Sequence, residues 1–274
     1  MIFLIKFFNT LLPILYLALV YLYGLYFFRT PRWILPHMAN LLRLTLGVHL
    51  VEVCLRGVYF QHFPLADVFE VLTVLALAIT LIYTYVEYRI KIKTTGFFIL
   101  IVSFLLQLIS SAFIDFAHAI PEVLKSVMFV FHTSAILVSY AALFVAALYS
   151  LMYLLLFYKI KNAQFGIIYG RLPSLEELSE MNIRAVILGF LALSAAIFLG
   201  IMWRKTAYPD APHFDPKVII SYLVWVIYGL VIYGNKIRKW AGKQLAYLSV
   251  SGFLLILFSM IVVNLFLETF HRFQ

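Results

Sequence analysis

The segment WRKTAYPDAPHFDPK, residues Trp203–Lys217, separates two long apolar runs, Ile183–Met202 and Val218–Tyr233. An apolar run of about 20 residues is long enough to cross a lipid bilayer as a helix. The polar segment between the runs cannot lie in hydrocarbon, because its backbone groups would have no hydrogen-bond partners there. The pattern therefore predicts two membrane-spanning helices joined by a loop on one membrane face.

The composition of the whole chain agrees with a membrane protein. Of its 274 residues, 65% are hydrophobic and 12% are charged, whereas soluble domains are roughly half apolar and a quarter charged. The mean hydropathy is +1.01. The single cysteine, Cys54, excludes an internal disulfide, a CxxC redox pair and a thiolate metal cluster. The net charge of +9 is typical of basic cytoplasmic loops, and no motif indicates a nucleic-acid partner.

We expect an all-α, polytopic fold with eight transmembrane helices, arranged as a single transmembrane domain over residues 1–274. The expected spans are about 9–28, 39–59, 67–86, 96–115, 126–158, 184–203, 217–234 and 244–268. The N-terminal run is interpreted as a retained helix rather than a cleaved signal peptide. In the connection 159–183, Ser174 followed by Glu177 predicts a short surface helix after Pro173.

The distribution of Lys and Arg predicts the orientation, because cytoplasmic loops carry more of them. One set of connections carries Arg29, Arg32, Arg89, Lys91, Lys93, Lys159, Lys161, Arg171, Arg184, Lys236, Arg238, Lys239 and Lys243. The opposite set, with both termini, carries Lys6, Arg56, Lys125, Arg204, Lys205, Lys217 and Arg272. The excess of the first set predicts that both termini and the 203–217 loop face outward.

Four separated segments resemble, in order, the cytochrome c assembly protein family of CcsA-, CcmC- and HemX-like heme-handling membrane proteins. They are HFPLADVFE (62–70), FHTSAILVSYAAL (131–143), Trp203–Lys217 and VNLFLETFHRF (263–273), and the family-like core covers about 40–274. The family hallmark is an outward, tryptophan-rich loop that ends Trp-Asp-Pro-Lys. In members of this family, the two helices that flank the loop each carry an outer-face histidine that ligates heme iron. The resemblance thus implies an outward heme loop at 203–217.

The residues of this chain match the family pattern only in part. Trp203, Asp215, Pro216 and Lys217 occupy family positions, whereas Tyr208, Pro212 and Phe214 stand where tryptophan is expected and Tyr233 where a membrane-embedded histidine is common. The resemblance implies His132 and His271 as the two ligands of the heme iron. It implies Trp203, Tyr208 and Phe214 as an apolar platform for the porphyrin, and Lys217 as a partner for a propionate.

A second group of polar residues lies within the second span. His49, Glu52 and Arg56 follow one another at helical spacing and share one face. Ionisable groups inside a span usually face the protein interior in pairs. The two interpretations are a structural Glu52–Arg56 pair with His49 beside it, and a transmembrane heme site with His49 as a ligand.

The resemblance implies a heme-handling protein of cytochrome c biogenesis in the bacterial inner membrane. It would bind heme b non-covalently and present it at the outer face for attachment to apocytochrome c. The expected partners are heme, apocytochrome c and a CcsB/ResB-type membrane subunit. The chain would be a component of a heme lyase (cytochrome c synthase) without a side-chain nucleophile of its own. The alternative is a HemX-like membrane regulator of glutamyl-tRNA reductase and tetrapyrrole synthesis.

Overall fold

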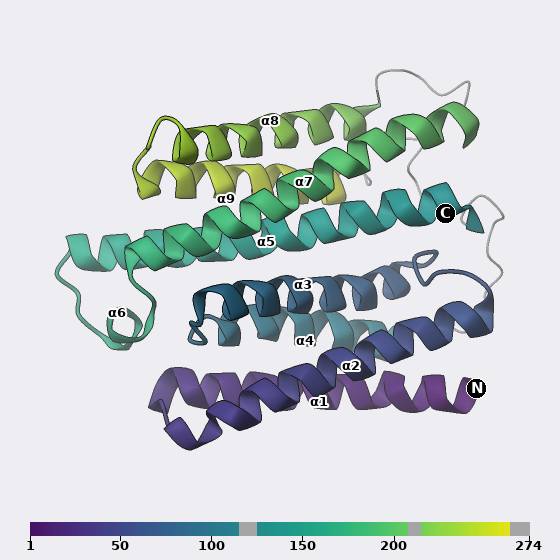
Figure 1. Ribbon diagram of the computed structural model, residues 1–274, viewed down its shortest axis with the longest axis horizontal. Helices are drawn as coiled ribbons and strands as arrows, with labels where there is room; N and C mark the ends of the chain where they lie inside the picture. Colours follow the sequence, from purple (N-terminus) through teal and green to yellow (C-terminus); the bar gives the residue numbers. More distant parts are fainter. Residues whose placement is uncertain (115–124, 208–214, 264–274) are drawn as a thin grey trace. The chain divides into compact units, whose positions relative to one another are not determined.

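The computed structural model describes residues 1–114, 125–207 and 215–263, and for 205–207 and 262–263 the backbone alone. Within these ranges the chain is helical and contains no strand (Figure 1). The helices are α1 Ile2–Arg29, α2 Leu35–Phe60, α3 Val68–Ile90, α4 Gly96–Phe113, α5 Val127–Lys161, α6 Ile167–Arg171, α7 Leu175–Ala207, α8 Pro216–Lys236 and α9 Gly242–Phe258, with a short 3-10 turn η1 Arg32–Ile34 and a π turn η3 Ser259–Val263. Eight helices are long and apolar enough to cross a membrane, which confirms the predicted all-α, eight-span architecture.

The predicted boundary before α7 is wrong. Ser174 and Glu177 form the expected reciprocal cap, since the Glu177 N–H donates to Ser174 Oγ at 3.2 Å and the Ser174 N–H donates to Glu177 Oε2 at 2.8 Å. The helix that they start is not a separate short surface helix that ends before the predicted span at 184. It continues through residue 184 as the first turns of α7, because the polar residues at 176–184 interrupt the hydropathy signal without interrupting helical hydrogen bonding.

The chain forms two compact units, which we describe separately. Unit 1 comprises residues 1–130 and 165–173 and contains α1 to α4 and α6. Within it, α4 packs against both α1 and α3, and α1 also packs against α2 (Figure 1). Gly96 allows the close approach at the start of α4, because a Cβ there would overlap the Tyr23 ring and the Tyr83 hydroxyl. The expected single transmembrane domain stays a prediction.

At the α3–α4 end of unit 1, the Glu87 carboxylate joins three elements. It accepts hydrogen bonds from the phenols of Tyr23 on α1, at 2.8 Å, and Tyr83 on α3, at 2.5 Å. The Lys93 ammonium forms an ion pair with its other oxygen at 2.5 Å. A buried carboxylate with charged and phenolic partners on both oxygens is well compensated, so this cluster fixes the end of the unit.

Unit 2 comprises residues 131–164 and 174–274, and its described part contains α5, α7, α8 and α9. In this unit α8 packs against both α7 and α9. The Tyr228 hydroxyl of α8 donates to the Ser249 carbonyl of α9 at 2.9 Å, and Gly252 leaves room for the Tyr228 ring. Ser139 of α5 donates to the Gly189 carbonyl of α7 at 2.9 Å, which links these two long helices midway.

Candidate functional site

His132 lies near the start of α5, and its side chain is directed against α7 in unit 2. Its Nδ1 lies 2.9 Å from the carbonyl oxygen of Ala196. A carbonyl oxygen only accepts, so Nδ1 carries the hydrogen, and the neutral imidazole has its lone pair on Nε2. Histidines that ligate metals commonly donate their other N–H to a carbonyl, which fixes both tautomer and ring orientation. The local geometry therefore suits Nε2 as a metal ligand.

Two residues of α7 shape the space around the His132 ring. Gly200 faces the imidazole so closely that a Cβ built on it would lie 2.7 Å from Cε1 and 3.1 Å from Nδ1. The Trp203 indole stacks on the imidazole with ring centroids 5.9 Å apart and an interplanar angle of 29°. Both rings are largely buried, at 8% exposed each. Because Ala196, Gly200 and Trp203 recur at helical spacing, one face of α7 holds the His132 ring.

The Asp-Pro-Lys sequence at the other end of the 203–217 loop begins α8. The buried Asp215 carboxylate caps the helix by accepting the Lys217 N–H at 2.9 Å. Pro216 occupies the first turn, where its missing N–H costs no hydrogen bond. A carboxylate at a helix N-terminus also interacts favourably with the helix dipole. Asp215 therefore sets where α8 begins and where the Lys217 backbone lies.

The remaining residues of the predicted heme site, Tyr208, Phe214 and His271, lie outside the described residues. The structure thus brings together His132 and Trp203, and it gives Asp215 a local capping role. The joint ligation of iron by His132 and His271 stays a prediction. Sequence reasoning missed Ala196 and Gly200, since a backbone carbonyl carries no residue signal and a glycine inside an apolar run has many explanations.

In unit 1, His49 is part of a buried hydrogen-bonded chain. Thr73 donates its hydroxyl hydrogen to Gln107 Oε1 at 2.6 Å, so its oxygen accepts from His49 Nε2 at 3.1 Å. His49 Nδ1 then accepts from the Tyr16 hydroxyl at 2.9 Å. Both ring nitrogens thus have side-chain partners, and the imidazole is fully buried. Iron ligation by His49 would require one of these two bonds to break.

Glu52 and Arg56 form a buried ion pair one turn further along α2. Arg56 Nη2 also donates to Asn9 Oδ1 at 2.8 Å, and Asn9 Nδ2 donates to the Ser111 carbonyl at 3.1 Å. The guanidinium thus joins α2 to α1, and the Asn9 amide extends the connection to α4. Pairing and hydrogen bonding of this kind are what make a buried charge tolerable in a membrane protein.

Sequence reasoning found the ion pair but missed its partners on the other helices. A signal was present in α1, where Asn9, Tyr16 and Tyr23 recur every seven residues and therefore share one face. All three are buried in unit 1 and form hydrogen bonds with side chains of other helices. A polar stripe along an otherwise apolar helix predicts an internal network, although it does not name the partners.

The fold and these two regions define a polytopic membrane protein with a buried polar network around His49 and Arg56 and an imidazole–indole pair at His132 and Trp203. The family model described as "Cytochrome C assembly protein" matches residues 65–271. Because this match covers most of the chain, the protein belongs to the cytochrome c assembly protein family, and this membership supports a role in cytochrome c biogenesis. The matched range includes His49's partner Thr73 and the whole of α7 and α8.

Individual relatives agree with the family match. The chain is 26% identical over 266 residues to the cytochrome c biogenesis protein CcsA of Mesostigma viride, covering 85% of this chain and 87% of the relative. It is 27% identical to a CcsA of Prochlorococcus marinus, covering 78% of this chain and 76% of the relative. It is also 27% identical to CcsA of Chlamydomonas reinhardtii, covering 84% of this chain and 67% of the relative. Residence in a bacterial inner membrane, as opposed to another membrane, stays a prediction.

Proposed function

We propose that the chain binds heme b non-covalently, with His132 and His271 as the two iron ligands, and presents it at the outer membrane face for attachment to apocytochrome c. Family membership supports the general role. The single observation that carries the assignment to this site is the His132 imidazole, held by the Ala196 carbonyl in the tautomer with its lone pair on Nε2.

The chain's own residues would bind and orient the porphyrin. His132 holds the iron from α5, and Trp203 extends the apolar surface beside it, joined in this proposal by Tyr208 and Phe214. Lys217 supplies a cation for a propionate, and Asp215 fixes the start of α8 from which Lys217 projects. When bound, heme supplies the vinyl groups to which the thiols of the apocytochrome add. Positioning of this kind lowers the entropic cost of the reaction without a protein nucleophile.

The proposal includes a second membrane subunit of the CcsB/ResB type. The single cysteine, Cys54, cannot supply a dithiol for keeping the apocytochrome reduced, so that reducing activity would also come from another protein. The alternative HemX-like regulator of glutamyl-tRNA reductase rests on the departures at Tyr208, Phe214 and Tyr233. It stays a sequence-based prediction.

A maturation assay tests the function. The chain is produced with a CcsB/ResB-type subunit and a reporter apocytochrome in a host without its own maturation system, and covalently bound heme is measured by in-gel peroxidase staining. His132→Ala should abolish reporter maturation, whereas His37→Ala, at an exposed histidine of α2, should retain it. Normal maturation with His132→Ala, at equal protein levels, would contradict the proposed site.

Cysteine labelling tests the outward orientation. In a Cys54→Ser background, a cysteine at Asp210 should react with a membrane-impermeant reagent in intact spheroplasts, and one at Arg238 should not. Arg238 is exposed in the connection between α8 and α9, so its protection would reflect the membrane rather than burial. The reverse labelling pattern would move the proposed heme site to the cytoplasmic side.

A further inference from the structure

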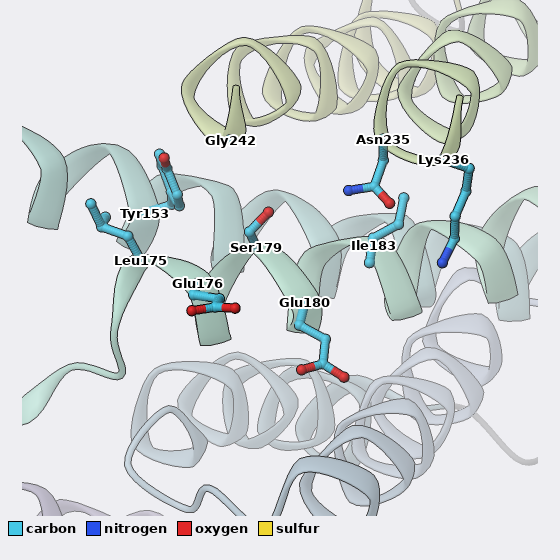
Figure 2. A pocket seen from close by; sticks show the side chains of 9 residues that line it. All are labelled: Tyr153, Leu175, Glu176, Ser179, Glu180, Ile183, Asn235, Lys236 and Gly242. Atoms are coloured by element: carbon cyan, nitrogen blue, oxygen red, sulfur yellow. The ribbon is translucent and has the colours of Figure 1, made fainter. Parts of the chain in front are cut away.

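Unit 2 contains a cavity far from His132. It has a volume of about 450 Å³, and it lies among the ends of α5, α7, α8 and α9 (Figure 2). Tyr153, which lines it, follows His132 by 21 residues on α5, which places the two about 30 Å apart along the helix. This separation is comparable to the thickness of the hydrocarbon core, so the cavity and the His132 site belong to opposite ends of unit 2.

The position of the cavity along the helices places it at the level of lipid headgroups. It is bordered by the first residues of α7, the last residues of α8 and the first residue of α9, all of which are helices of membrane-spanning length. Polar groups and water meet the bilayer at such helix ends. The volume is within the range of roughly 300–1,000 Å³ that is common for small-molecule sites. A lipid headgroup is therefore the ligand that this position favours.

Donor groups line the α7–α8 side of this cavity. Figure 2 shows Ser179 on α7 and Asn235 on α8 directed toward the same space, with Lys236 extending from α8 toward α7. Among the residues that the structure describes, the side chains of these three residues form no hydrogen bond or ion pair. An ammonium, an amide and a hydroxyl that line one side of a cavity without partners in the described part of the chain are suited to the oxygens of a phosphate group.

Carboxylates line the same cavity from α7. Glu180 is paired with Arg184 at 2.5 Å, whereas Glu176 has no ion-pair partner within the described part of the chain. Glu176 is exposed at the cavity rim. A carboxylate at this place repels a headgroup with only negative charge and attracts an ammonium. An ammonium that carries N–H groups satisfies it better than a quaternary one, which has no donor.

We propose that this cavity binds a zwitterionic phospholipid with a primary ammonium, phosphatidylethanolamine. Its phosphate contacts Lys236, Asn235 and Ser179, and its ammonium contacts Glu176. Its acyl chains then lie along the apolar outer faces of the helices, where large side chains such as Leu151 and Tyr233 are exposed. The lipid site is independent of heme binding, since it uses no residue of the His132 site.

Native mass spectrometry of the detergent-purified full chain tests the proposal. Phosphatidylethanolamine, phosphatidylcholine and phosphatidylglycerol with identical acyl chains are titrated separately. One molecule of phosphatidylethanolamine should bind about tenfold more tightly than either other lipid, given the strength of hydrogen bonds to charged groups. Lys236→Gln and Glu176→Gln should each weaken its binding by about fivefold or more. Arg238→Gln, which removes a cation two residues beyond Lys236 and outside the cavity lining, is the matched control and should leave binding within about twofold.

A charge reversal gives the sharper result. Glu176→Lys should shift the preference from phosphatidylethanolamine to phosphatidylglycerol, because the cavity then carries a second cation in place of the carboxylate. Equal binding of the three lipids by the unmodified chain would overturn the proposal, as would equal effects of Lys236→Gln and Arg238→Gln. Displacement of phosphatidylethanolamine by added heme in His132→Gly protein would assign the cavity to a porphyrin instead.

Discussion

His49 in unit 1 and His132 in unit 2 are both buried in membrane-spanning helices, but their surroundings differ. Both nitrogens of His49 bond to side chains, the Tyr16 phenol and the Thr73 hydroxyl. His132 has a backbone carbonyl on Nδ1, a glycine against its ring edge and an indole stacked on its face. The first environment satisfies an imidazole within the protein. The second fixes its tautomer and orientation, as at known types of metal site.

We propose that this membrane protein uses histidine in two ways, one structural and one for heme binding. In unit 1 the imidazole belongs to a hydrogen-bond network with Tyr16, Thr73 and Gln107. Its role there is to stabilise the packing of the helices. In unit 2 the ring is held by contacts from α7 that fix its tautomer and orientation, and its role as an iron ligand is our proposal. If this distinction is correct, changes in unit 1 should affect folding first, and changes around His132 should affect heme binding first.

The largest effect on folding is expected at the buried ion pair of unit 1. Arg56→Gln leaves the Glu52 carboxylate without its charged partner and removes the donor to Asn9 Oδ1. Breaking a buried pair in this way costs about 3–5 kcal/mol. The thermal midpoint and the monodisperse yield in detergent should therefore fall sharply, while the heme bound per folded molecule is unchanged.

Two variants control this prediction. Glu52→Gln combined with Arg56→Gln should recover part of the loss, because no unpaired charge remains. Arg43→Gln removes an exposed arginine from the same helix and should have little effect. A stability for Arg56→Gln equal to that of Arg43→Gln would show that the pair is not buried in the folded protein.

A smaller effect on stability, with a large effect on heme, is expected at the α7 face that holds His132. Gly200→Ala adds a Cβ where the His132 ring lies 2.7 Å away, so the ring or α7 must shift. Overpacking of this kind costs about 1–3 kcal/mol. The fraction of purified protein that carries heme, measured by absorbance, should fall to less than half.

Gly229→Ala is the matched control for this change. Gly229 is also a helical glycine of unit 2, but a Cβ there would lie 3.5 Å from the nearest atom, in ordinary contact with Phe190. It should leave both stability and heme content near those of the unmodified chain. If Gly200→Ala and Gly229→Ala behaved alike, the close approach of α7 to His132 would have no role in heme binding.

The smallest effect is expected from His49→Gln. The amide can replace one of the two hydrogen bonds but not both, so we expect a loss of about 1 kcal/mol in stability. Heme content and spectrum should be unchanged relative to His37→Gln. Loss of about half the heme on His49→Gln would instead support the transmembrane heme site with His49 as a ligand, and would remove the distinction between the two histidines.

Much of the fold was predictable from the sequence, because the bilayer imposes a length and an apolar composition on each span. The predicted start of the sixth span was wrong because hydropathy does not report helix formation by charged residues. Residues 175–183 carry charge, and they nevertheless form the first turns of α7. A π turn follows Phe258, and the expected end of this span at 268 lies outside the described residues and stays a prediction.

Less of the site was predictable. The resemblance drew attention to His132 and Trp203, which lie side by side on α5 and α7. The groups that orient His132 are a backbone carbonyl and a glycine, which have no distinctive signature in a single sequence. The partners of His49 lie on α1 and α3. Helical spacing identifies neighbours within one helix, so it cannot identify partners on other helices. Such contacts depend on how helices pack, which one sequence does not reveal.

The most direct test of the central claim, that His132 is an iron ligand, is the absorption spectrum of purified protein carrying heme. The unmodified chain should show the low-spin spectrum of bis-imidazole heme in both oxidation states. His132→Gly should lose most of the heme, and added imidazole should restore part of the heme and of the low-spin spectrum, because it fills the position that the side chain has left. An unchanged low-spin spectrum in His132→Gly without imidazole would contradict the account.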